Sequence, residues 1–87
     1  MTGLALGDEL TIVTAAQTRD RITPYLAAAT DLELDLSEVS DIDTAGLQLL
    51  LMARREAERR GATVTLADPS PAVQDLFEFT HLSAELQ

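Results

Sequence analysis

The chain has 87 residues, a net charge of −9 and no cysteine. Its size predicts one domain over residues 1–87, and its acidity argues against nucleic acid as a partner, because the phosphate backbone repels acidic surfaces. The lack of cysteine excludes disulfides and thiolate metal sites. There is no run of about 18 apolar residues and no secretion-signal pattern, so we expect a cytoplasmic location without membrane insertion.

The N-terminal residues predict two short strands. Leu4–Leu6 is a short apolar stretch, and Glu9–Thr14 alternates and carries β-branched residues. A turn signal at Gly7 and Asp8 lies between them. We therefore expect these strands to pair as a hairpin.

Residues 15–28 predict the first helix, with Thr14 as its N-cap. Pro24 interrupts the pattern, because proline removes a backbone donor and clashes with the preceding turn. Two interpretations remain open. One is a single kinked helix, which we favour, and the other is a second helical piece that Thr23 caps, with Pro24 at its first position.

The middle of the chain predicts a strand, a polar connection and a long helix. Residues 31–36 alternate polar and apolar side chains, as a half-buried strand does. The connection 37–43 ends in Asp43, whose carboxylate suits a helix N-cap. The helix then covers 44–60 and ends at Gly61.

The long helix is apolar on more than one side. One stripe of mostly small residues suits close packing on a sheet, and it comprises Gly46, Leu50, Ala53 and Ala57. Leu47, Leu51 and Met52 fall toward another side. A surface helix needs only one apolar stripe, so the second side indicates either contact with a neighbouring helix or a partner-binding patch.

The C-terminal third predicts a strand at 62–67 and a helix at 71–79 that Ser70 caps, and no pattern assigns an element to 81–87. The whole order is β-β-α-β-α-β-α. It predicts an α/β sandwich with one four-stranded mixed sheet and three to four helices.

The candidate chemistry is sparse. Asp41 and Asp43 are spaced as in some phosphatase loops, but the chain has no lysine to hold a phosphate. His81 is the only histidine and has no base partner in a motif. We therefore expect no catalytic residue, no metal site and no cofactor. The acidic residues form either a solvated surface or a face that steers a basic protein partner.

The segment from Leu34 to Leu47 reads Leu-Asp-Leu-Ser-Glu-Val-Ser-Asp-Ile-Asp-Thr-Ala-Gly-Leu, and a leucine-rich helix that ends in Arg-Arg-Gly follows it. This pattern resembles the signature of the STAS domain, which is named for sulfate transporters and anti-sigma factor antagonists. The element order and the length fit as well. The resemblance implies a STAS-like fold and a regulatory protein that is not an enzyme.

In the antagonists that this chain resembles, an Asp-Ser-Ser-Gly or Asp-Ser-Thr-Gly loop is phosphorylated on its second hydroxyl residue by a partner kinase of the anti-sigma type. The unphosphorylated form binds that kinase and frees the sigma factor. The corresponding position here is Ala45, which has no hydroxyl, so the resemblance leaves Thr44 as the phosphorylation candidate.

These features together imply that the chain docks a protein partner through the tip of the long helix. The predicted binding residues are Asp41, Asp43, Thr44, Ala45, Gly46, Leu47 and Leu51. The partner implied by the resemblance is a histidine-kinase-like anti-sigma ATPase. Three alternatives remain: a regulatory subunit of a lipid-transport ABC ATPase, an adaptor in a chemotaxis or two-component system, and a small-ligand carrier. Thr44 and Gly46 also fit a merely well-capped helix start.

Overall fold

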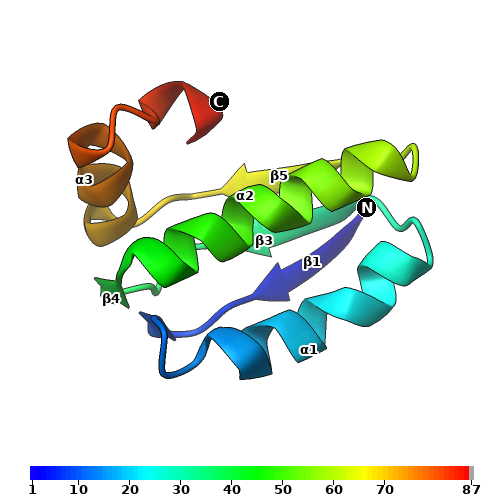
Figure 1. Ribbon diagram of the computed structural model, residues 1–87, viewed down its shortest axis with the longest axis horizontal. Coiled ribbons are helices and arrows are strands. Elements are labelled where there is room, and N and C mark those ends of the chain that lie inside the picture. The colour runs from blue at the N-terminus through cyan, green and yellow to red at the C-terminus, as the bar shows by residue number, and fades with distance from the viewer. Residues whose placement is uncertain (87) are drawn as a thin grey trace.

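The computed structural model describes residues 1–86. Its main sheet has three parallel strands in the order β1-β3-β5 (Figure 1). They are β1 (Thr2–Ala5), β3 (Leu32–Asp35) and β5 (Val64–Ala67). A second, two-stranded parallel ladder joins β2 (Glu9–Leu10) to β4 (Asp41–Ile42).

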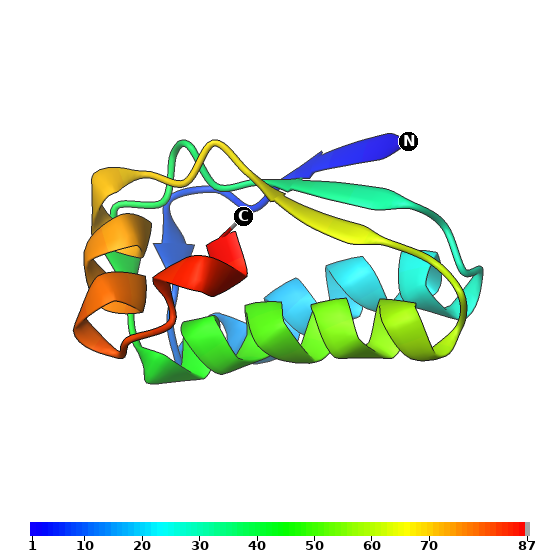
Figure 2. The same ribbon diagram turned by 90° about the horizontal axis from the view of Figure 1, so that it is seen from above.

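The molecule has two main layers. Figure 2 shows the sheet as one layer, with α1 (Ala15–Ala27) and α2 (Thr44–Arg59) side by side as the other. The helix α3 (Pro71–Phe79) lies at one end of the molecule, and the 3-10 helix η1 (Ser83–Leu86) follows it and lies beside β5 and α2. No helix of residues 1–86 covers the outer face of the sheet, where Glu33 and Thr65 are exposed.

The core lies between the two layers. Leu32, Leu34 and Leu66 alternate with exposed residues along their strands, so their side chains all point toward the helices. The predicted small-residue stripe of α2 meets them, and Gly46, Leu50, Ala53 and Ala57 are all buried. Small side chains bring a helix backbone close to a sheet, so α2 is the central helix of the core.

The prediction of one four-stranded mixed sheet was wrong. All observed pairings are parallel, and β1 pairs with β3 instead of forming a hairpin with β2. The predicted strand 9–14 ends at Leu10, because a turn begins at Thr11, where the amide of Thr14 donates to the Thr11 carbonyl at 3.0 Å. The short strand β4 lies in the stretch that we expected to be a loop.

The predicted helices are confirmed to within one residue at their ends. The helix α1 continues through Pro24 as one helix, as we favoured. The Thr14 side chain does not cap it, since its hydroxyl lies 3.1 Å from the Glu9 carbonyl and serves the loop instead. The predicted caps of the other two helices are present, with Asp43 accepting from Gly46 and Ser70 from Val73.

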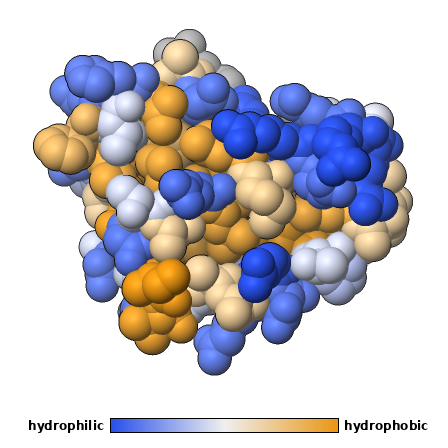
Figure 3. Space-filling model, viewed as in Figure 1, coloured by the Kyte–Doolittle hydropathy of each residue, from blue (hydrophilic) through white to orange (hydrophobic). Residues whose placement is uncertain are grey.

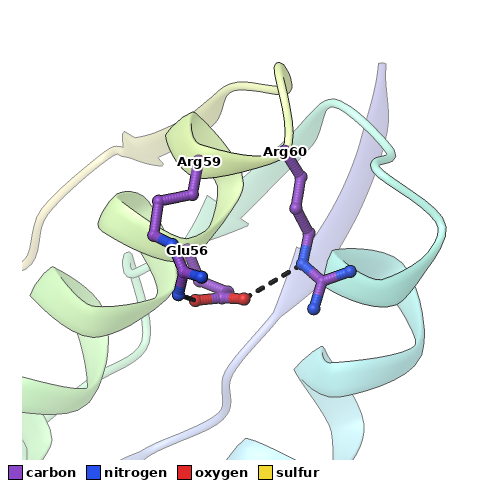
Figure 4. Close-up of polar contacts among 3 residues, drawn as sticks. All are labelled: Glu56, Arg59 and Arg60. Atoms are coloured by element: carbon purple, nitrogen blue, oxygen red, sulfur yellow. Dashed lines mark hydrogen bonds and ion pairs between the residues drawn. The ribbon is translucent and has the colours of Figure 1, made fainter.

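A small ion-pair group lies at the C-terminal end of α2. Glu56 contacts Arg59 at 2.8 Å and Arg60 at 3.0 Å, and Figure 4 shows its carboxylate between the two guanidinium groups. Cations are favoured at a helix C-terminus. The chain then leaves the helix at Gly61, whose φ of +77° suits glycine.

Candidate partner-docking site

The carboxylate of Asp43 joins two separate segments at the N-terminal tip of α2. Its Oδ1 accepts from the Gly46 amide at 3.1 Å and thereby caps the helix. Its Oδ2 accepts from the Ile12 amide at 2.9 Å. One side chain therefore fixes the connection of residues 11–14, between β2 and α1, against the tip of α2.

The backbones of β2 and of the first turn of α2 also approach each other closely at this tip. A Cβ added to Gly46 would lie 2.0 Å from the carbonyl oxygen of Leu10. The Asp43 amide also donates to that oxygen, at 3.3 Å. Only glycine lets the first turn of α2 lie this close to β2, so Gly46 positions the tip.

The connection presents two large apolar side chains to solvent. Ile12 is 72% exposed and Val13 is 79% exposed. Hydrogen bonds inside the loop fix its shape. The Thr11 hydroxyl donates to the Glu9 carboxylate at 2.7 Å and accepts from the Val13 amide at 3.2 Å. In Figure 3 hydrophobic surface gathers over this connection, at the lower left.

A groove continues from this loop between α1 and α2. It has a volume of about 350 Å³ and is open to solvent. The lining residues are mostly small or apolar: Ile12, Ala15, Ala16, Arg19, Ala45, Gln48, Leu49 and Met52. Ala45 thus lies in the groove, and Thr44 is exposed beside it on the tip.

Leu47 and Leu51 lie on the opposite flank of α2. With Gln48, Arg55 and Leu82 they line a second hollow of about 360 Å³. Leu47 is only 4% exposed and belongs to the core, whereas Leu51 is half-buried. The second apolar side of α2 is therefore partly covered by the segment that follows α3, and little of Leu47 is available to a partner.

The predicted site residues otherwise gather at one end of the molecule. Asp41 is exposed on β4, which pairs with β2 just before the apolar loop. Sequence reasoning missed Ile12 and Val13, because a β-branched run next to alternating residues is typical of a half-buried strand. The preceding Gly7-Asp8 turn gave no indication that the strand would stop at Leu10.

Within residues 1–86 no group of three or more His, Cys, Asp or Glu side chains could hold a metal ion. His81 is exposed and lies just after α3. Over the same residues, no helix is long and apolar enough to cross a bilayer.

Acid should release the loop from the tip of α2. The Ile12 and Gly46 amides donate to the ionised carboxylate and hold the pKa of Asp43 below its ordinary value of about 3.9. A lowered folded-state pKa stabilises the fold at pH values above the unfolded pKa, and this contribution is lost as the pH falls through the folded pKa. NMR should therefore show the Ile12 and Gly46 amide protons titrating together, below the ordinary aspartate value.

Asp43→Asn is the control for this titration, because it keeps an oxygen for the helix cap and removes the charge. The two amides should no longer titrate together in that variant. A common midpoint at or above the ordinary value in the unchanged chain would mean that the carboxylate does not bridge the two segments in solution.

The family model described as "Mlab, STAS domain" matches residues 1–87. No curated protein sequence matches this chain. Among solved structures, the anti-sigma factor antagonist SpoIIAA in its unphosphorylated form is 27% identical, with a TM-score of 0.77 over 94% of this chain and 73% of that one. The phosphorylated form of SpoIIAA, a Bacillus cell fate determinant, is 25% identical, with a TM-score of 0.72 over 94% of this chain and 76% of that one.

A sulfate transporter family protein from Wolinella succinogenes shares the fold at 19% identity. Its TM-score is 0.75 over 99% of this chain and 70% of that one. The two kinds of protein for which the STAS domain is named are thus both among the structures similar to this chain. Because the family model spans every residue of the sequence, the chain belongs to the STAS domain family.

Proposed function

We propose that residues 1–87 act as one STAS domain of the anti-sigma factor antagonist type, which regulates a protein partner by docking and catalyses no reaction. The observation that carries the proposal is the exposed pair Ile12 and Val13, which Asp43 fixes beside Thr44 and the groove at Ala45. Burial of large apolar side chains is the main favourable term in most protein association. A fixed loop also loses little conformational freedom on binding.

The partner that fits best is a histidine-kinase-like ATPase of the anti-sigma type. The likeness to SpoIIAA, an anti-sigma factor antagonist, supports this choice. The small residues at the tip support it too, because Ala45 and Gly46 let another backbone approach closely. Asp41 and Asp43 would then form an acidic rim around the apolar contact.

Phosphorylation of Thr44 would control docking. SpoIIAA has been solved in phosphorylated and unphosphorylated forms, and the Thr44 side chain is exposed at the first position of α2. A phosphate there adds about −1.5 to −2 charges beside Asp43, which disfavours a docked apolar surface. Ala45 occupies the usual acceptor position and carries no hydroxyl, so Thr44 is the hydroxyl that remains.

Ala45→Glu should weaken binding to a partner kinase of the anti-sigma type by more than about tenfold, or about 1.4 kcal/mol. The new carboxylate must lose its water in an apolar groove next to Asp43. The fold should survive, since a carboxylate in the first turn of a helix is favoured. Calorimetry measures the affinity, and circular dichroism verifies folding.

Ala27→Glu is the matched control, because it makes the same change at the far end of α1 and should leave the affinity unchanged. Thr44→Ser should leave the affinity nearly unchanged, because it keeps the hydroxyl. Thr44→Asp should weaken binding as a phosphate would. Undiminished binding by folded Ala45→Glu would place the interface elsewhere and leave Thr44 as a helix-start residue.

A regulatory subunit of a lipid-transport ABC ATPase is the second candidate. Two observations favour it: the matching family model is named Mlab, and Asp43-Thr44-Ala45-Gly46 resembles the small subunits of lipid-asymmetry transporters. In that case the same tip would dock the ATPase. The same variants tested against an ABC ATPase of the lipid-transport type separate the two candidates.

A further inference from the structure

The cations of this chain are concentrated in the helix layer. All the arginines lie on α1, on α2 or at the C-cap of α2: Arg19, Arg21, Arg54, Arg55, Arg59 and Arg60. The acids are distributed differently, since only Asp20, Glu56 and Glu58 lie on these two helices. The helix layer is therefore positive in a chain whose net charge is −9.

Most of these arginines have partners within the chain. Three form ion pairs and one donates to a backbone carbonyl: Arg54, Arg59, Arg60 and Arg21. The exceptions are Arg19 and Arg55, which are both exposed. Within residues 1–86, neither of their guanidinium groups forms an ion pair or a hydrogen bond.

These two arginines line the two hollows that flank α2. Among residues 1–86, Arg19 is the only charged residue that lines the groove between α1 and α2. In the same way, Arg55 is the only charged residue that lines the hollow at Leu82. Gln48 is exposed and lines both hollows, so it separates them. Figure 3 shows this face of the helices, where hydrophilic side chains lie among hydrophobic surface.

Docking on this face would remove both guanidinium groups from water. A partner that fills the groove beside Ala45 covers Arg19, and a surface that also covers Gln48 reaches Arg55. Burying a charge costs free energy unless an opposite charge pairs with it. No acid of residues 1–86 lines either hollow, so the opposite charges have to come from the partner.

We propose, on the basis of the function proposed above, that the partner's docking surface carries two carboxylates among apolar side chains. One would pair with Arg19 and the other with Arg55, on the two sides of Gln48. Arginine suits this role, because its guanidinium group can form two parallel hydrogen bonds with one carboxylate.

The charge around these hollows favours a protein surface over a bilayer or a nucleic acid. A dense array of phosphates would be repelled by the net charge of −9 and by Asp41 and Asp43 at the tip of α2. Two separate carboxylates instead match two separate guanidinium groups, and such complementarity fixes which partner binds and in which register.

Arg19→Glu tests the pair in the groove. It should weaken binding to a partner kinase of the anti-sigma type by about tenfold or more, because two carboxylates would then face each other. Arg55→Glu should weaken binding in the same way. Arg19→Lys keeps the positive charge and should retain most of the affinity. Calorimetry measures the affinity, and circular dichroism verifies that each variant is folded.

Arg59→Glu is the matched control, because it makes the same change on α2 outside both hollows, at a side chain that is 76% exposed. It should leave the affinity nearly unchanged. An equal loss with Arg59→Glu would indicate long-range attraction instead of pairing, and it would overturn the inference. Unchanged or tighter binding by folded Arg19→Glu would overturn it too, and so would a failure of Arg19→Lys to retain affinity.

Ala45→Glu in the same assay separates this inference from the proposed function. If Ala45→Glu weakens binding and Arg19→Glu does not, the docking site stands and the paired carboxylates are wrong. If neither substitution weakens binding, both the docking site and the pairing are wrong.

Discussion

Gly46→Ala should destabilise the fold by about 3 kcal/mol or more, the upper end of the cost of overpacking. An alanine inside a helix normally stabilises it by about 1 kcal/mol relative to glycine. Here the added Cβ would meet the Leu10 carbonyl oxygen at 2.0 Å, and both atoms belong to fixed backbone. The tip of α2 would have to move away from β2 and from the loop that carries Ile12.

Gly3→Ala is the control, because a Cβ there meets nothing within 4 Å. We expect that variant to be as stable as the unchanged chain or slightly more so, since alanine restricts the unfolded chain. Urea unfolding followed by circular dichroism measures both. Equal stabilities for the two variants would show that β2 and α2 do not pack this closely in solution.

Phe77→Ala should cost about 3–5 kcal/mol, the range for truncating a buried phenylalanine. Phe77 is 0% exposed and is one of the largest fully buried side chains. It lies on α3, which closes one end of the core. A small domain has about 5–15 kcal/mol of stability in all, so this substitution should remove a large part of it.

Phe79→Ala makes the same change two residues along the same helix. Phe79 is 81% exposed, so we expect an effect within about 0.5 kcal/mol. Thermal unfolding of the two variants under identical conditions compares them directly. If the two substitutions cost the same, α3 does not hold Phe77 in the core.

The long helix and its cap were predictable because their signals are local. Asp43 precedes an apolar helical repeat, and Gly61 follows it, so both ends of α2 can be read within a few residues. Ser70 before Pro71 marks the start of α3 in the same way. These caps depend on contacts three residues apart, which a sequence displays directly.

The sheet was less predictable because its pairing depends on distant residues. A strand of two residues, such as β4, is too short to show periodicity. The second contact of Asp43 joins it to Ile12, 31 residues earlier, in the turn that ends β2 at Leu10. The exposed pair Ile12 and Val13 at the site therefore emerged only from tertiary structure, and so did the burial of Leu47.

The central claim is that a partner docks on the tip of α2 and the loop beside it. The most direct measurement is a titration of the ¹⁵N-labelled chain with an unlabelled partner kinase of the anti-sigma type, followed through the backbone amide signals. We predict that the largest changes affect Ile12, Val13 and residues 44–48, while Glu33 and Thr65 on the open sheet face stay unchanged. Changes confined to the open sheet face, with the signals of Ile12 and Ala45 unmoved, would contradict the claim.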